Sequence, residues 1–542
     1  MRPQASDIVT AMEFSGVESD VHDPPRRNAV EPDARAPGPL RGAVSLLLLL
    51  LAAVSATWAL VNPLASVPDE PAHVMYAAAV VRGDFGSGPI GVIVHIPAKL
   101  STDLAIGCTA FHPEIPLWKC PAVPPTGDVI VVAQSTAGGR PPLYYALVGW
   151  VSYLPFLSTT GTWMLMRLLS VAVGVSLIGL PFWLIRFRRP GWLVLGVLGA
   201  FTPLVGFFLG SVNPSSLEIA AAIGMCVAAA GLFGAGPGTT RDEMNRRAAA
   251  LAVTSAVLVL ARPFTYAELA GLLLTFALLT PRASRGAAST HLGLLARWAL
   301  VPLVAIVAAL VFARLHPFVE TPNQPSVRAL LGYVFDMFPT LPGYLIENVG
   351  IYGWRDYALP EGLKWLGIAL PGTLLLVGFA AGRRLQRLGL LVLTVGATVV
   401  APLAVGVLVF KDVWIAYQGR YSMALIVGLP ILGAAVAMLG GVHPARVGRW
   451  TAGAAVWMVL LLNVYSWGMT VVRYSAGFPF LSKAPARVAE FHWYLGAVAT
   501  AAALVAFGTT VWLAWALSRR LQLPTTWVDE EPATPVPALE TA

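Results

Sequence analysis

Long apolar runs recur along this chain and are separated by short polar stretches. A helix needs about 20 apolar residues to cross a bilayer. Runs of about that length fall at 42–62, 163–185, 192–210, 216–235, 247–261, 264–280, 297–315, 364–382, 389–410, 421–440, 450–470 and 492–517. The pattern predicts an all-α polytopic membrane protein with about 12 transmembrane helices.

One further apolar stretch, 143–157, is short for a span and directly follows Pro141 and Pro142. We expect it to be re-entrant or to lie along the membrane interface. If it crossed the bilayer, every later segment would be inverted, and the charge pattern described next would fail at most of them.

Charge is sparse in this chain, and its placement orients the helices. Charged residues make up 12% of the sequence, against about 25% in soluble proteins, which excludes an ordinary cytosolic enzyme, a disordered protein or a coiled coil. The positive-inside rule assigns the basic clusters between spans to the cytoplasm. They are Arg186, Arg188 and Arg189; Arg241, Arg246 and Arg247; Arg282, Arg285 and Arg297; Arg383, Arg384 and Arg387; Arg446 and Arg449; and Arg519 and Arg520.

This orientation places both termini in the cytoplasm and accounts for the net charge of +8 without a nucleic-acid partner. Residues 1–41 are predicted to be a disordered cytoplasmic tail, and 518–542 a second cytoplasmic tail. Two long loops, 63–142 and 316–363, fall outside the cytoplasm. The Arg-rich, Lys-poor composition is typical of a high-GC bacterium, so we expect the bacterial cytoplasmic membrane to hold the chain.

Two cysteines, Cys108 and Cys120, fall in the first outer loop, on the oxidising side of the membrane. We expect them to form a disulfide. The alternative is two free thiols. Cys226 lies within a span, where it serves as a small apolar residue.

The most concentrated polar motif follows the first span and contains Asp69, Glu70 and His73 between prolines. Asp69 suits a helix N-cap and Pro71 the first turn of a helix that runs to about Arg82. The spacing brings Asp69 and His73 toward one face. One acid can then serve as a general base, or the set can bind a divalent metal ion. The simpler interpretation is a capped helix with solvated acids.

Other polar groups recur on the same predicted outer face. Arg262 breaks the positive-inside rule there and favours an anionic partner. Each of the others suits an ordinary loop or ion pair, but two arginines that face a carboxylate cluster can hold a phosphate near a base. The further positions are Asn213, Trp354, Arg355, Asp356, Gln418, Arg420 and Tyr421.

Seven short segments together resemble the signature of a bacterial membrane-protein family, that of domain of unknown function 2142. They occur in the family's order and cover roughly Ser45 to Ala516. The segments are 68–73, 140–145, 202–203, 211–214, 262–264, 353–356 and 418–421. That family is in turn similar to C-type glycosyltransferases, such as protein mannosyltransferases and aminoarabinose transferases.

The resemblance implies a C-type glycosyltransferase-like bundle, with a catalytic transmembrane module at 42–363 and C-terminal helices at 364–517. It implies inverting transfer of a sugar from a polyprenyl-phosphate donor to an envelope glycan, glycolipid or protein acceptor outside the membrane. Asp69 would be the general base, Glu70 or His73 would orient it or contact the donor, and Arg262 or Arg420 would stabilise the phosphate. The remaining substrate contacts would be Asn213, Tyr144, Trp354, Arg355, Asp356, Gln418 and Tyr421.

The resemblance leaves some points open. Asn213 stands where those enzymes often have Asp, and some relatives work without a metal, so the need for a divalent ion at Asp69, Glu70 and His73 is not decided. Two other classes remain. A transporter or lipid flippase would place ionisable groups near mid-span, whereas here they cluster at the outer end. A non-catalytic envelope scaffold gives no reason for the acids and His73 beside prolines.

Overall fold

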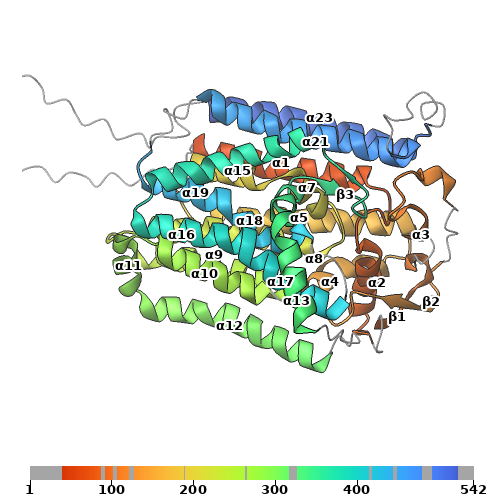
Figure 1. Cartoon of the computed structure of the whole chain (residues 1–542), viewed down its shortest axis with the longest axis horizontal. Coiled ribbons are helices and arrows are strands. Elements are labelled where there is room, and N and C mark those ends of the chain that lie inside the picture. Colours follow the sequence, from red (N-terminus) through yellow and green to blue (C-terminus); the bar gives the residue numbers. More distant parts are fainter. Residues whose placement is uncertain are drawn as a thin grey trace, which may run out of the picture. The chain divides into compact units, whose positions relative to one another are not determined.

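A computed structural model describes residues 39–86, 92–101, 106–120, 127–187, 190–262, 265–316, 326–413, 418–442, 449–478 and 491–522. Within these ranges, 11 helices are long and apolar enough to cross a membrane, or up to 12 if a bent pair counts as one span. The predicted all-α polytopic class is confirmed (Figure 1). Both predicted tails lie almost wholly outside the described residues, as do Arg188, Arg189 and Arg446.

The long helices pack side by side. Some packed pairs are neighbours in the sequence and others are far apart in it. The closest pairs are α8 with α9, α15 with α19, α1 with α23 and α9 with α12 (Figure 1). Their bounds are α1 Pro39–Val61, α5 Thr159–Leu184, α8 Pro214–Phe233, α9 Arg241–Ala261, α12 Leu292–Leu315, α15 Glu361–Ala381, α16 Arg384–Val395, η5 Gly396–Val400, α17 Ala401–Val413, α19 Gly428–Leu439, α21 Arg449–Ala476 and α23 Ala497–Leu521.

Shorter helices connect the long helices or lie beside them. Their bounds are α2 Glu70–Val80, η1 Ala98–Leu100, α3 Ile106–Thr109, η2 Leu117–Lys119, α4 Leu143–Gly149, η3 Trp150–Tyr153, α6 Pro190–Ala200, α7 Pro203–Leu209, α10 Thr265–Leu279, α11 Arg282–Ser289, α13 Val327–Met337, η4 Phe338–Thr340, α14 Leu341–Glu347, η6 Gly419–Ser422 and α18 Met423–Ile426. Helices α4 and η3 are together too short to cross a bilayer, in agreement with the prediction for 143–157.

The predicted span 192–210 is broken in the structure. The structure breaks it into α6 and α7, which meet at an angle of 82°. Pro203 cannot donate a hydrogen bond to the preceding turn, and the Thr202 side chain accepts a bond from Val205 N as the N-cap of α7. Because the whole stretch is apolar, hydropathy alone could not reveal the break.

The second outer loop is also more regular than predicted. Helices α13, η4 and α14 form a run, Val327–Glu347, that is itself long and apolar enough to count as a candidate span. A short antiparallel hairpin follows, with β3 Ile351–Tyr352 paired to β4 Tyr357–Ala358.

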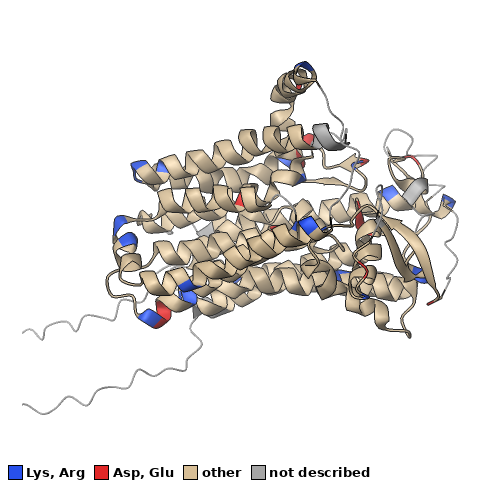
Figure 2. Ribbon diagram, turned by 90° about the horizontal axis from the view of Figure 1, so that it is seen from below, with Lys and Arg blue, Asp and Glu red and all other residues tan. Residues whose placement is uncertain are grey.

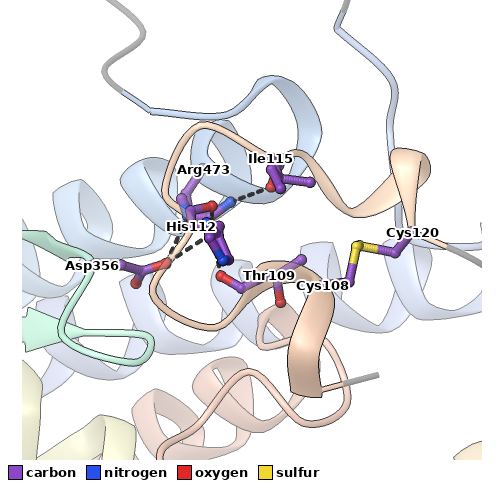
Figure 3. The surroundings of a disulfide bond; sticks show 7 residues. All are labelled: Cys108, Thr109, His112, Ile115, Cys120, Asp356 and Arg473. Atoms are coloured by element: carbon purple, nitrogen blue, oxygen red, sulfur yellow. Dashed lines mark hydrogen bonds and ion pairs between the residues drawn. A yellow bond between two sulfur atoms is a disulfide. The ribbon is translucent and has the colours of Figure 1, made fainter. Parts of the chain in front are cut away.

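The predicted first outer loop is folded around a two-stranded antiparallel sheet and a disulfide. Strands β1 Val92–Pro97 and β2 Ile130–Ser135 pair antiparallel, with Val94 opposite Ala133. Cys108 and Cys120 form the predicted disulfide (Figure 3). Alternate strand residues and α2 bury one apolar cluster, which includes Val94, Ile96 and Tyr76, and so this loop holds α2 in place.

Charged residues divide between the two ends of the bundle. Figure 2 shows basic residues at both ends, among them those at the helix ends remote from the β1–β2 sheet, and most acidic residues near the sheet. The chain enters and leaves the bundle at the basic end, since Gly42 in α1 lies beside the Arg520 guanidinium of α23.

Candidate active site

Asp69 lies at the N-cap of α2, as predicted, but its side chain does not cap the helix. The residue has φ of 63°, a left-handed conformation that costs energy for a non-glycine residue and is enriched at functional sites. Its carboxylate forms an ion pair with Arg420, with 2.8 Å between Oδ2 and Nη2. The Asp69 side chain is 38% exposed and that of Arg420 is 8% exposed, so the acid remains accessible.

The arginines around Asp69 set its charge. Enclosure by protein opposes ionisation, but the guanidinium groups of Arg420 and Arg140 outweigh it and lower the pKa of Asp69 from 3.8 to about 2. Asp69 is therefore a carboxylate throughout the neutral range.

His73 lies on the same side of α2, one helical turn from Asp69. Its ring is almost fully buried, and Nδ1 and the Tyr145 hydroxyl are hydrogen-bonded at 3.0 Å. Burial first, and then the positive charge of Arg140, hold the pKa of His73 well below 6.5, so the ring is neutral at pH 7. Arg262 and Arg420 contribute to the same lowering of the pKa, which places three guanidinium groups around this ring.

Arg262 and Arg420 meet at Tyr421. The Tyr421 ring lies 5.8 Å from the Arg262 guanidinium and 5.4 Å from that of Arg420. Arg262 Nη1 also donates to Ser215 Oγ at 3.1 Å and to Glu218 Oε2 at 3.0 Å. The structure thus brings together five predicted residues, Asp69, His73, Arg262, Arg420 and Tyr421. Gln418 is the N-cap residue of the turn η6, which carries Arg420. Pro263, Phe264 and Tyr417 lie outside the described residues.

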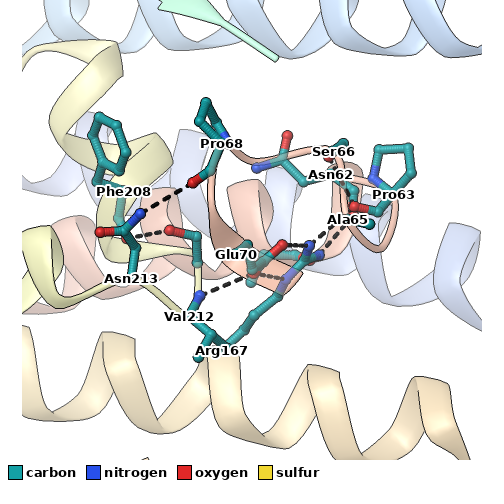
Figure 4. Close-up of polar contacts among 12 residues, drawn as sticks. Asn62, Pro63, Ala65, Ser66, Pro68, Glu70, Arg167, Phe208, Val212 and Asn213 are labelled. Carbon is teal, nitrogen blue, oxygen red and sulfur yellow. Dashed lines mark hydrogen bonds and ion pairs between the residues drawn. The ribbon is translucent and has the colours of Figure 1, made fainter. Parts of the chain in front are cut away.

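Glu70 does not share this site. Its side chain is fully buried in an ion pair with Arg167 of α5, with distances of 2.8 Å from Nε to Oε1 and 2.5 Å from Nη2 to Oε2 (Figure 4). Val212 N donates to the same carboxylate at 2.9 Å. Arg167 also donates to the carbonyls of Ala59, Asn62 and Pro63. Glu70 therefore forms a buried bridge that fixes the start of α2.

Sequence reasoning missed Arg167, although a lone arginine in the apolar run 163–185 was a usable signal. A charge within a span is costly unless it is paired. Its partner, Glu70, is 97 positions away in the sequence.

Asn213 and Tyr144 have structural partners. Asn213 Nδ2 donates to Pro68 O at 3.2 Å, and its Oδ1 accepts from Ser215 N as the N-cap of α8 (Figure 4). It therefore braces the residue before Asp69. The Tyr144 hydroxyl is buried against Ser170 Oγ at 2.7 Å, and the neighbouring Tyr145 is the tyrosine that is hydrogen-bonded to His73.

Residues of the β3–β4 hairpin contact the chain segments on both sides of the site. Trp354 Nε1 donates to Ala65 O at 3.0 Å, four residues before Asp69. Arg355 pairs with Glu347 at 2.7 Å, and Glu347 also accepts from Gly419 N at 3.2 Å. These predicted substrate contacts thus hold the two loops that carry Asp69 and Arg420.

Asp356 has a separate partner, Arg473 of α21, at 2.8 Å. The same arginine donates to the carbonyls of Thr109, His112 and Ile115 in the disulfide loop (Figure 3). Arg473 therefore ties the first outer loop to the hairpin. It was not predicted, because its partners come from two distant segments.

A metal site is not formed by the predicted trio. Within the described ranges, no group of three or more His, Cys, Asp or Glu side chains is arranged to hold a metal ion. Glu70 is committed to Arg167 and Asp69 to Arg420. The side chains present do not fit a divalent ion.

An apolar cavity of about 140 Å³ adjoins the arginine end of the site. Its lining includes Gly199 at the α6–α7 break, Gly372 of α15, Asn348, and Met423, three residues after Arg420. The Asn348 side chain packs against Gly419, and its buried Oδ1 has no hydrogen-bond partner among the described residues. The cavity therefore begins beside the turn η6, which carries Arg420.

The fold and the site define a polytopic helical membrane protein with a cluster of charged side chains at one end of its bundle. The family described as "Predicted membrane protein (DUF2142)" matches residues 51–429. The chain belongs to this family.

Solved structures offer a distant likeness. ArnT from Cupriavidus metallidurans bound to undecaprenyl phosphate is 16% identical, with a TM-score of 0.45, over 89% of this chain and 77% of that one. Its apo state is 14% identical, with a TM-score of 0.43, over 90% of this chain and 78% of that one. Likeness at this level carries no argument about substrates. No curated protein matches the chain significantly.

Proposed function

We propose that this protein is a membrane glycosyltransferase that moves a sugar from a polyprenyl-phosphate donor to a cell-envelope acceptor on the extracytoplasmic face. One observation carries the proposal: a partly exposed carboxylate, Asp69, is paired with Arg420, and Arg420 shares the Tyr421 ring with a second arginine, Arg262. The family motifs that resemble C-type glycosyltransferases coincide with these residues.

The arginines supply the phosphate site. A guanidinium presents several donors in a plane that matches two phosphate oxygens. Arg262 and Arg420 share the Tyr421 ring, so one phosphate between them would contact both. As the sugar leaves, these charges would stabilise the phosphate oxygen that gains the electron pair.

Asp69 supplies the base. Its carboxylate would take the proton of the acceptor hydroxyl while that oxygen attacks the anomeric carbon and the bond from that carbon to the phosphate oxygen breaks. A single displacement of this kind inverts the anomeric carbon. A carboxyl with a pKa of about 2 is a weak base,. A phosphate on Arg420 would share the guanidinium charge and raise the pKa of Asp69 when the donor is bound.

The remaining predicted catalytic residues act as positioning residues in this proposal. His73, neutral and bonded to Tyr145, would fill the wall beside Asp69 without adding positive charge. Glu70 would fix the first turn of α2 through Arg167, and thereby the place of Asp69.

The cavity beside Arg420 suits the lipid part of the donor. Its lining is almost entirely apolar and it lies among helices long enough to cross a membrane. A donor that diffuses within the bilayer would place its phosphate on the arginines and part of its isoprenoid chain in the cavity.

The decisive experiment is Asp69→Asn in purified protein, assayed with polyprenyl-phosphate sugars and a panel of envelope acceptors. Loss of a general base lowers transfer by about 10²–10⁴-fold, so we expect at least a hundredfold loss, with polyprenyl phosphate still bound. Asp128→Asn, at an exposed carboxylate in the same outer loop, is the matched control.

Full transfer by Asp69→Asn would overturn the proposed base. A lipid flippase would use the same arginines to hold a phosphate headgroup but would not need Asp69. Lipid movement without sugar transfer, unchanged in Asp69→Asn, would therefore favour the flippase.

A further inference from the structure

Phe111 is an exposed aromatic residue of the disulfide loop, Cys108–Cys120, and its backbone is strained. Its side chain is 69% exposed, and its φ of 63° lies in the left-handed region. This conformation costs free energy for a residue with a Cβ, whereas glycine adopts it without that cost. Neither burial nor backbone conformation therefore explains a phenylalanine at this position.

The chain on both sides of Phe111 is held in place by Arg473. This arginine is fully buried, and its guanidinium donates to three carbonyls around Phe111. They belong to Thr109, His112 and Ile115, at 3.0, 2.8 and 2.7 Å (Figure 3). The exposure of the Phe111 ring is therefore a property of a loop that is anchored at three points and closed by a disulfide.

A second aromatic ring, that of Trp354, lies against Phe111. The ring centroids are 5.6 Å apart and the ring planes meet at 60°. Trp354 is half-buried in the β3–β4 turn, between Gly353 and Arg355, which both have positive φ. The indole N–H already donates to Ala65 O, so this ring offers a ligand its π surface.

The two rings lie beside the candidate active site. Ala65, which accepts the bond from Trp354, comes four residues before Asp69. Its Cα is at most roughly 14 Å from that of Asp69, because an extended chain rises by about 3.5 Å per residue. A ligand that reaches Asp69 from the side of the disulfide loop would therefore pass over these rings.

The surroundings of Phe111 favour a hydrated ligand. His112 and Glu114 are 52% and 53% exposed, and Arg355 beside Trp354 is 31% exposed. A pyranose ring has a face of C–H groups that stacks on the negative face of an aromatic ring, and its hydroxyls bind polar side chains. The hydrocarbon of a bilayer is the other apolar partner, but charged groups beside Phe111 oppose insertion there.

We propose that Phe111 and Trp354 form a stacking platform for the acceptor, and that the acceptor is a glycan or the glycan part of a glycolipid. At least one of its pyranose units, other than the one that reacts, would stack on Phe111. This inference rests on the proposed function, because it names the acceptor class of the same site. Phe111 becomes a specificity-determining residue outside every motif that the sequence singled out.

The test compares three substitutions of Phe111. Phe111→Gly removes the ring and suits the left-handed backbone, so it should fold at least as stably as wild type in thermal unfolding. Phe111→Leu keeps an apolar side chain without a flat ring, and Phe111→Tyr keeps the ring. Phe156→Leu, at another exposed phenylalanine, which follows η3, is the matched control.

The probes are soluble mono- to hexasaccharides of mannose, galactose and rhamnose, bound to purified protein without donor. We expect Phe111→Gly and Phe111→Leu to weaken oligosaccharide binding about fivefold, the contribution of one aromatic contact. Monosaccharide binding should not change, and Phe111→Tyr and Phe156→Leu should bind as wild type. Where transfer is seen, the KM for the acceptor should rise by the same factor, with kcat little changed.

Two results would overturn the platform: wild type that binds none of the oligosaccharides, or Phe111→Leu that binds them as wild type does. The second would mean an apolar contact without stacking, as with a bilayer. Asp69→Asn should bind these glycans normally, because Asp69 is not part of the platform. Binding that depends on the Phe111 ring, in a protein that transfers no sugar, would instead overturn the proposed function and the acceptor role, and the glycan site would stand.

Discussion

At the scale of single residues, the Asp69–Arg420 pair decides when the base is charged. Arg420 contributes to holding the pKa of Asp69 near 2 instead of 3.8. Because the folded pKa is lowered, the ionised form persists as pH falls until it approaches 2. We expect Arg420→Gln to return the pKa of Asp69 toward or above its usual value, since burial then acts with less opposition.

The measurement is kcat/KM against pH, which reports groups of the free enzyme. Wild type should lose no rate through Asp69 between pH 3.5 and 7, whereas Arg420→Gln should lose rate progressively below about pH 5. The overall rate of Arg420→Gln will also fall, because a phosphate ligand is lost, but the position of the acid limb is independent of that loss. An unmoved acid limb would show that Asp69 is not the titrating base.

The residue types of the candidate site could be predicted from the sequence, whereas their partners could not. Asp69, His73, Arg262 and Arg420 were identified because they break the charge rule or cluster beside prolines, and the structure brings them together. Glu70 looked equivalent to Asp69 in the sequence. Because Glu70 lies one position further along the start of α2, its side chain points in another direction and pairs with Arg167. Such pairings depend on helix rotation, which a single sequence does not specify.

At the scale of elements, the disulfide loop and the β3–β4 hairpin act as one support. Arg473 holds three carbonyls of the loop and Asp356 of the hairpin. Phe111 of the loop packs on Trp354, with ring centroids 5.6 Å apart, and Trp354 in turn holds Ala65. Contacts therefore run from the disulfide to the segment that carries Asp69.

We expect Cys108→Ser/Cys120→Ser to lower the free energy of unfolding by about 3 kcal/mol, because a cross-link over 12 positions no longer restricts the unfolded chain,. Thermal unfolding in detergent, with and without reductant, checks this. The reductant should destabilise wild type and leave the double variant unchanged. Cys226→Ala, at the buried free cysteine, should keep the reductant effect, and its loss there would contradict the assignment.

The elements themselves were predictable to different degrees. Uniform apolar runs such as α1 and α8 gave correct spans because length and hydropathy suffice. The same uniformity concealed the bend between α6 and α7, where Thr202 and Pro203 act locally. The helices of Val327–Glu347 were read as loop because charged and polar residues interrupt a marginally apolar run.

At the scale of the whole molecule, charge separates the bundle into two ends with different uses. One end carries basic residues at the ends of the helices, and the other carries the paired and clustered charges of the site (Figure 2). The cavity lies among α6, α7, α14, α15 and α18. No single helix encloses it, so it is a property of the assembled bundle that the sequence could not reveal.

The cavity leads to a prediction about the donor's lipid. Gly372 lines it, and a Cβ added there would meet no atom within 4 Å. Gly372→Phe should therefore fold, since it also replaces a poor helix former within α15, and its ring would occupy much of the cavity. We expect the KM for long-chain polyprenyl donors to rise about tenfold or more, with kcat little changed.

Two comparisons separate this effect from general damage. Gly362→Phe lies on the same helix, also in open space and away from the cavity, and should leave the KM unchanged. A donor with a single isoprene unit, too short to reach far past Arg420, should be used equally by wild type and Gly372→Phe, because only the chain beyond the phosphate would enter the cavity. Equal losses with short and long donors would mean that the lipid binds elsewhere. Selective loss with the long donor would connect the arginines at the bundle's end to a lipid path among its helices.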